Sequence, residues 1–378
     1  MAVSVFPTGT TIYNPEKCWN GFTVLQCMQF GAALVDMNGN LVKRWKNLQG
    51  LPSANKIFPG GYIMGTTGQR NPKFGFQDNV NLVQLDWDGN IVWSFDNYDL
   101  VRDPHRKKTW MARQHHDYQR DGNPVGYYVP GVEPKVDSGN TIMVCHKNLV
   151  NKEISEKLLV DDTVIEVTWD GEIVWEWICS EHFHEFGFSE EARNTMARNP
   201  GIVPAGGGVG DWMHMNSISK LGPNRLYESG DERFNPENLI FSGRETNILA
   251  IIEKKTGKII WKVGPYYTET EALRNLRQIV GPHHVHMIPA GCGNAREKPD
   301  PRGPSARESA PGRCSEASRP PFGPAHPRAA RWIAEGPDIG YTRYPGVDRE
   351  SDIEPRAAEP IQLLDRLKTD QYRWMSGW

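Results

Sequence analysis

One hairpin pattern recurs four times along the chain, and it limits the possible folds more than any other feature. In each copy an apolar run reaches a turn containing Asn-Gly, Asp-Gly or Thr-Gly and continues as a second apolar run. This is the strongest short-range signal for a β-hairpin. In three copies a Trp closes the second run, four residues after the glycine. The copies span residues 33–42, 82–93, 164–175 and 248–261.

The spacing of the copies predicts a β-propeller. The turn glycines, Gly39, Gly89, Gly171 and Gly257, are about 50, 80 and 85 residues apart. A second turn-like element lies between the hairpins and adds further strands to each unit, so that each unit has about four. Four-stranded units with long insertions are typical of propeller blades. These second elements span residues 58–64, 137–144, 221–227 and 288–294.

Helical signals are few and lie in insertions. Ser189 is placed to cap a short helix through Met196, and Thr268 with Glu271 forms a capping box before a second one. We therefore predict an all-β propeller with helical insertions over residues 1–291.

The chain changes character at Cys292. Residues 292–360 are dense in Pro, Arg, Ala, Gly and Ser, with few aliphatic residues and no strand or helix period. This composition predicts disorder, and it also arises when a GC-rich reading frame is translated out of register. We therefore expect the last blade to be incomplete. Residues 361–378 could form one short helix.

Charge and hydropathy argue against several functional classes. The net charge is −3, and the charges are interspersed along the chain rather than grouped in blocks. This distribution does not favour nucleic acid or an anionic membrane surface as a partner. No run of eighteen apolar residues and no secretion signal is present, which predicts a soluble cytoplasmic protein.

Histidines cluster at three corresponding places of the repeat, in residues 114–117, 211–217 and 281–286. If each place is the innermost strand of a blade, the three clusters meet at the central channel. The alternative for any single histidine is an ordinary half-buried side chain satisfied by the backbone. Recurrence at the same place of the repeat favours a shared functional site.

These residues resemble the bacterial arylsulfotransferases, a family of six-bladed propellers. The similar motifs are His-His-Asp at 115–117, Asp-Trp-x-His-x-Asn-Ser at 211–217, Ser-Gly-Arg-Glu-Thr-Asn at 242–247 and the His-rich segment 283–286. The resemblance covers about residues 5–291. It implies transfer of a sulfuryl group from a phenolic sulfate ester to a phenol through a sulfohistidine, without a metal or another cofactor.

The resemblance also implies roles for individual residues. The nucleophile is expected in the 283–286 segment, where we favour His283, with His284 and His286 as alternatives. Fixed donors would stabilise the negative charge on the sulfuryl oxygens, and His115 or His116 would assist the leaving oxygen or the acceptor hydroxyl. The expected donors and substrate-binding residues are Arg244, His214, Asn216, Asn247 and Asp211.

Other interpretations remain open at this point. Asn216 could bond to backbone at a strand end, and Arg244 could form an ordinary ion pair between blades. The spacings His284-x-His286 and His182-x-His184 are compatible with a metal on one strand face, although we expect none. The alternatives to a sulfotransferase are a propeller lyase or metal-dependent hydrolase that uses the same His and Arg set, and a non-catalytic binding scaffold. The expected partners are small molecules, and the oligomeric state is left open.

Overall fold

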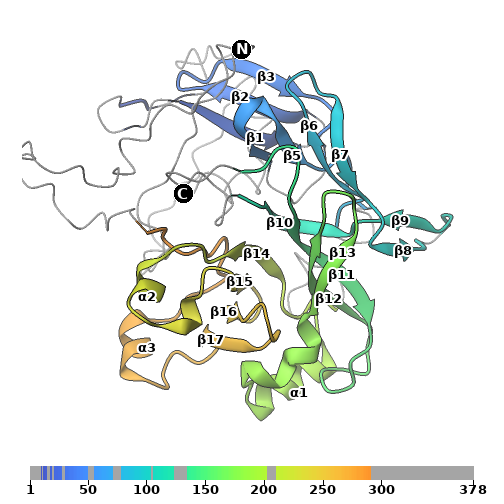
Figure 1. Ribbon diagram of the computed structural model, residues 1–378. Coiled ribbons are helices and arrows are strands. Elements are labelled where there is room, and N and C mark those ends of the chain that lie inside the picture. Colours follow the sequence, from blue (N-terminus) through green and yellow to red (C-terminus); the bar gives the residue numbers. More distant parts are fainter. Residues whose placement is uncertain are drawn as a thin grey trace, which may run out of the picture.

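The computed structural model describes residues 10, 12–14, 18, 21–27, 30–49, 55–70, 78–103, 105–122, 134–201 and 210–290. These residues form a mostly β structure in which four antiparallel sheets follow one another around an arc (Figure 1). The segments 292–360 and 361–378 lie outside the described residues, so the predictions for them stay predictions.

Each sheet is a simple meander in chain order. The first contains β1 (Phe22–Cys27), β2 (Gly31–Asp36) and β3 (Leu41–Trp45). The second contains β4 (Lys56–Ile57), β5 (Ile63–Gly65), β6 (Leu82–Leu85) and β7 (Ile91–Phe95). The third contains β10 (Gln114–Arg120), β11 (Thr141–Leu149), β12 (Leu159–Val167) and β13 (Ile173–Ile178). The fourth contains β14 (Met215–Lys220), β15 (Leu239–Gly243), β16 (Ile248–Ile252) and β17 (Ile259–Val263).

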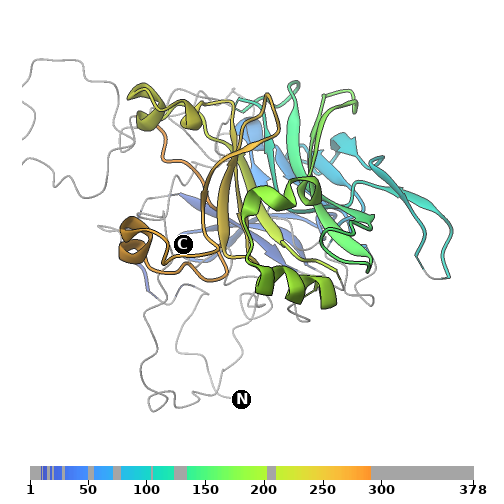
Figure 2. The ribbon, with the colours of Figure 1, turned by 90° about the horizontal axis from the view of Figure 1, so that it is seen from below.

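The remaining elements lie in the connections between and beyond these sheets. A small two-stranded sheet pairs β8 (Asp99–Val101) with β9 (Thr109–Met111). The α-helices are α1 (Glu190–Arg198), α2 (Arg225–Glu228) and α3 (Glu271–Leu276), and they lie at the periphery of the sheets in both views (Figures 1 and 2). The 3₁₀ helices are η1 (Pro59–Gly61), η3 (Cys179–Phe186) and η4 (Glu232–Phe234). No helix in the described part of the chain is long and apolar enough to span a membrane.

The four predicted hairpins belong to four successive sheets. They are β2–β3, β6–β7, β12–β13 and β16–β17, and the turn glycine of each has a positive φ between 75° and 95°. Glycine adopts this conformation without steric cost, which explains its recurrence at the turns. The all-β propeller arrangement is therefore confirmed with four sheets, whereas the count of six blades stays a prediction.

Apolar layers between neighbouring sheets form the core. One layer joins the first and second sheets through Trp45 and Ile63, and another joins the second and third through Trp93 and Met143. The largest layer lies between the third and fourth sheets, where Phe186, Trp212 and Phe241 are among the buried side chains. Successive face-to-face layers are the packing expected of propeller blades.

A repeated tryptophan contact joins each sheet to the next. The indole N–H of Trp45 donates to the carbonyl of Asp86 at 3.2 Å, that of Trp93 to Trp169 at 2.8 Å, and that of Trp177 to Gly257 at 2.8 Å. Each acceptor lies in the hairpin turn of the following sheet. Trp175 and Trp261, which close the second runs of their hairpins, are only partly buried, whereas Trp177 is buried.

Two local predictions need correction. Ser189 does cap α1, through a 3.3 Å bond from the N–H of Ala192, but the cap of α3 is Thr270 rather than Thr268. We expected residues 221–227 to lead directly into a strand, yet they enter α2. The side chain of Asn224 caps that helix by accepting the N–H of Tyr227 at 3.0 Å.

Candidate functional site

The innermost strands of three sheets meet at Asp117. Its Oδ1 accepts a hydrogen bond from Nζ of Lys56 on β4 at 2.6 Å, and its Oδ2 accepts the backbone N–H of Ile218 on β14 at 3.0 Å. Segment 281–288 joins them, because the N–H of Val285 donates to Oγ of Ser217 at 3.1 Å. The three histidine clusters are thereby brought to one place.

Histidine rings of the first two clusters are in direct contact. The ring centroids of His116 and His214 are 4.9 Å apart, and those of His115 and His116 are 5.2 Å apart. One histidine in each cluster has a left-handed backbone, with φ of 53° at His116, 54° at His214 and 50° at His284. Such conformations carry strain and concentrate at functional sites.

His214 is held by an acidic partner. Its Nδ1 lies 2.6 Å from Oδ2 of Asp211, and both side chains are buried. Burial alone would lower the pKa of His214, but the carboxylate of Asp211 outweighs this effect and raises it above the usual value. His214 is therefore suited to act as a cation within the site.

His115 and His116 have different surroundings. His116 is partly exposed, and burial together with the charge of His214 lowers its pKa well below the usual value. His115 is fully buried, and burial lowers its pKa to about 3. The two Nδ1 atoms are 2.9 Å apart, so one ring donates a proton to the other. Of the two, His116 is the one that a substrate can reach.

The imidazole of His283 is fixed in one tautomer by the backbone. Its Nδ1 lies 2.7 Å from the carbonyl oxygen of Gly281, so Nδ1 carries the proton and Nε2 carries the lone pair. Burial lowers the pKa of His283 to about 3, and the neighbouring His214 and Arg244 act in the same direction. Asn247 supports this loop indirectly, since its Oδ1 accepts the N–H of Gly281 at 2.8 Å.

His284 and His286 belong to the same segment, and the charges of Asp117 and Lys56 act on both. The side chain of His284 is exposed to solvent. The protein atoms around it still remove part of its hydration, and this desolvation lowers its pKa. Burial and the charge of His284 lower the pKa of His286 to about 4. The two ring centroids are 5.5 Å apart, with an angle of 73° between the ring planes. Their charged neighbours therefore differ from those of His283.

Arg244 and Asn216 supply hydrogen-bond donors. The backbone N–H of Arg244 donates to the carbonyl of His214 at 3.0 Å, and its side chain, 27% exposed, pairs with Glu245 at 2.5 Å. Oδ1 of Asn216 accepts a hydrogen bond from Oγ of Ser242 at 2.8 Å. Its buried Nδ2 has no hydrogen-bond partner among the described residues. Neither residue is satisfied only by backbone or by an inter-blade ion pair.

His182 and His184, the second pair with a spacing compatible with a metal, each bind a different acidic residue. His182 stacks on Trp177 and pairs with Glu185 at 2.6 Å, whereas His184 pairs with Glu153 at 2.8 Å. The two imidazoles therefore have different acidic partners, and their spacing in sequence does not produce a joint ligand set.

Three further charged or polar residues at the site were not found from the sequence. His146 on β11 stacks on His115 with ring centroids 3.7 Å apart, and Asp162 on β12 faces both rings. Asp78 lies behind His146, with Oδ1 3.8 Å from its Nδ1. Burial raises the pKa of Asp162 to about 7. The sequence did hold a signal for Asp162, because two adjacent carboxylates interrupt the apolar run of β12, and this strand is buried throughout.

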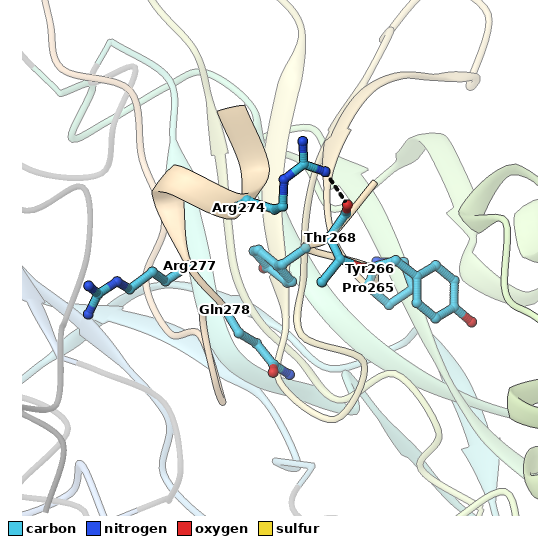
Figure 3. A pocket seen from close by; sticks show the side chains of 7 residues that line it. Pro265, Tyr266, Thr268, Arg274, Arg277 and Gln278 are labelled. Carbon is cyan, nitrogen blue, oxygen red and sulfur yellow. Dashed lines mark hydrogen bonds between the residues drawn. The ribbon is translucent and has the colours of Figure 1, made fainter. Parts of the chain in front are cut away.

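A separate pocket of about 370 Å³ lies beside α3 (Figure 3). One wall is fixed by Arg274, whose Nη1 donates to the carbonyl of Thr268 at 2.7 Å. None of the predicted site residues lines it. This pocket is therefore distinct from the histidine site.

Comparisons with known proteins agree with part of this picture. A crystal structure of a protein of unknown function from Bacteroides caccae is similar over 67% of this chain and 76% of that chain, with 10% sequence identity and a TM-score of 0.25. A likeness this low carries no argument. No curated protein matches the chain. Residues 134–274 match the family model of the arylsulfotransferases (ASST), which confirms the resemblance for this segment of the chain.

Proposed function

We propose that this protein transfers a sulfuryl group from an aryl sulfate ester to a phenol, with His283 as the nucleophile. The observation that carries the proposal is the His283 imidazole, whose Nδ1 is held by the carbonyl of Gly281, so that Nε2 is the unprotonated nitrogen, and on which the charges of His214 and Arg244 act. A lowered pKa keeps this imidazole neutral at physiological pH, as a nucleophile requires.

The first half-reaction forms a covalent intermediate. Nε2 of His283 attacks sulfur, the N–S bond forms, and the bond between sulfur and the aryl oxygen breaks. His116, which its lowered pKa keeps neutral, donates a hydrogen bond to the departing phenolate, and the phenolate takes its proton from solvent. Negative charge on the sulfuryl oxygens meets Arg244, the Asp211-supported His214 and the Nδ2 of Asn216.

The second half-reaction reverses these roles. His116 forms a hydrogen bond with the oxygen of the acceptor phenol, which releases its proton to solvent and attacks sulfur while the N–S bond to His283 breaks. The regenerated imidazole and the new aryl sulfate are the products. Splitting the transfer into two steps lets one set of donors serve both, so no nucleotide is consumed.

The test is sulfuryl transfer from 4-nitrophenyl sulfate to phenol. His283→Ala should abolish transfer, because the attacking nitrogen is lost. Arg244→Ala should lower turnover by roughly 10²-fold or more, the scale of removing one charge-stabilising donor. Arg244→Lys should recover only part, since an ammonium lacks the paired donors of a guanidinium. His182→Ala is the matched control and should leave turnover unchanged.

Trapping of the intermediate identifies the nucleophile directly. Incubation with 4-nitrophenyl sulfate and no acceptor should add one sulfuryl group to a peptide that contains residues 283–286. Labelling at another residue would overturn the assignment to His283. Absence of both labelling and turnover in the folded protein would favour the non-catalytic scaffold instead.

A further inference from the structure

We propose that His115, His146 and Asp162 bind a divalent transition-metal ion, with zinc as the best match, in the wall behind the histidine site. One ligand atom from each residue lies within 4.8 Å of the others, and all three side chains are buried. Nε2 of His115 is 3.1 Å from Oδ1 of Asp162, and Nε2 of His146 is 3.8 Å from the same oxygen.

Three polar atoms without hydrogen-bond partners point to one occupant. Nε2 of His115, Nε2 of His146 and Oδ1 of Asp162 are buried and make no hydrogen bond within the described part of the chain. A buried polar atom left unpaired costs about 1–3 kcal/mol, so native structures rarely keep several together. The other oxygen of Asp162 is satisfied, because Oδ2 accepts the N–H of Met215 at 2.8 Å. A single cation would satisfy all three remaining atoms once the two imidazoles, which stack with 26° between their planes, turn their Nε2 atoms toward it.

The spacing fits a tetrahedral ion. Ligand atoms about 2.0–2.1 Å from zinc in tetrahedral geometry are roughly 3.4 Å from one another. The two observed separations from Asp162, 3.1 and 3.8 Å, lie on either side of this value. Two imidazoles and one carboxylate form a ligand set typical of zinc and of other first-row divalent ions. A water molecule would complete the tetrahedron.

Outer contacts support the same ligand orientation. Nδ1 of His146 faces Oδ1 of Asp78 at 3.8 Å, and Arg113 holds the other oxygen of Asp78 at 2.8 Å. A carboxylate that accepts a hydrogen bond from the second ring nitrogen orients metal-binding histidines in many proteins, and a short approach of Asp78 to His146 would make this contact. Nδ1 of His115 lies 2.9 Å from Nδ1 of His116. Nδ1 of His115 is therefore paired, whereas the 3.8 Å between Nδ1 of His146 and Oδ1 of Asp78 exceeds a hydrogen bond, and both atoms lack a hydrogen-bond partner in the described part of the chain.

The proposed ion would also fix the proton on His116. When Nε2 of His115 binds the ion, its proton must be on Nδ1, from which it donates to Nδ1 of His116. The proton of His116 is then on Nε2, as a hydrogen-bond donor to the leaving phenolate requires. This consequence rests on the proposed function, whereas the metal site itself does not.

The first experiment measures metal in the purified full-length protein. Elemental analysis should find one divalent ion per chain, and cobalt added after chelation should give the visible absorption bands of a tetrahedral site. His146→Ala should lose both, whereas His182→Ala should keep both. A wild-type protein without bound metal that also gives no cobalt bands would overturn the proposal. His283→Ala should retain the ion, which separates this outcome from failure of the proposed function.

The second experiment compares the Tm of Asp162→Asn with that of wild type, because the metal site and an empty site predict opposite signs for the difference. Without an ion, Asp162→Asn would relieve a buried carboxylate and give the imidazoles a donor, so the Tm would stay equal or rise. With an ion, the same variant loses a ligand, and its Tm should fall below that of wild type. Chelator should lower the Tm of wild type but not of the variant. An equal or higher Tm with the same chelator response in both proteins would refute the site.

Discussion

Asp117 offers a direct test of how the sheets are held together at the centre. Its carboxylate bonds to Lys56 of the second sheet and to the backbone of Ile218 in the fourth, while Asp117 itself belongs to the third. The side chain of Lys56 is 12% exposed and that of Asp117 is 6% exposed. Replacing Asp117 by Asn removes the charge but keeps the shape, so Lys56 would remain buried without its partner.

The expected loss follows from the burial of this pair. Removing one partner of a buried ion pair typically costs about 3–5 kcal/mol, far more than the loss of a surface pair. For a domain of this size, each kcal/mol shifts the Tm by roughly 2–4 °C. Asp117→Asn should therefore lower the Tm by roughly 6–20 °C, measured by circular dichroism. Asp96→Asn, in an exposed loop, is the matched control and should change little.

The effect should also depend on pH. Burial opposes ionisation of Asp117, but Lys56 and His284 outweigh it and lower its pKa in the folded protein. A lowered folded pKa contributes stability above the unfolded pKa, near about 3.9, and loses it as the pH falls through the folded value. The Tm difference between wild type and Asp117→Asn should thus be full at pH 7 and smaller in acid. A difference of under a few degrees at pH 7, or one that grows in acid, would refute the inter-sheet role.

Two further predictions concern the acidic partner of His214 and a glycine packed against the backbone. Asp211→Asn should lower the pKa of His214, so that transfer falls most at high pH and recovers partly in acid; a pH profile identical to wild type would contradict this role. Gly210→Ala should unfold at a clearly lower temperature, because a Cβ there would lie 2.4 Å from the carbonyl oxygen of Leu158. Gly171→Ala shares the positive φ but meets nothing within 4 Å, so its smaller loss is the control, and equal losses would contradict the steric argument.

The repeat could be predicted from sequence because its signals are local. A turn glycine and two apolar runs define a hairpin within about a dozen residues, and all four hairpins have their expected glycine turns. Contacts between sheets are not local in the same way. Trp175 and Trp177 are both on β13, and only the position of the next sheet determines that Trp177 donates to Gly257.

Only the part of the candidate site that has a recurring signal in the sequence could be predicted. The clusters around His116, His214 and His283 share a place in the repeat, and the structure brings them together. His146 and Asp162 have no such recurrence in sequence. They enter the site because β11 and β12 pair in register, with His146 directly opposite Asp162. Neither strand carries a residue pattern that specifies this register, because both are apolar on each face over much of their length.

The third cluster explains why position in the repeat cannot by itself assign a catalytic role. His116, His214 and His284 share the left-handed backbone, so equivalence within the repeat would select His284 as the partner of the other two. The surrounding charges select differently. Asp117 and Lys56 act on His284, whereas His214 and Arg244 act on His283. A sulfuryl group needs cationic donors around its oxygens, which is why we propose His283, on which Arg244 acts, as the nucleophile rather than His284, on which a carboxylate acts.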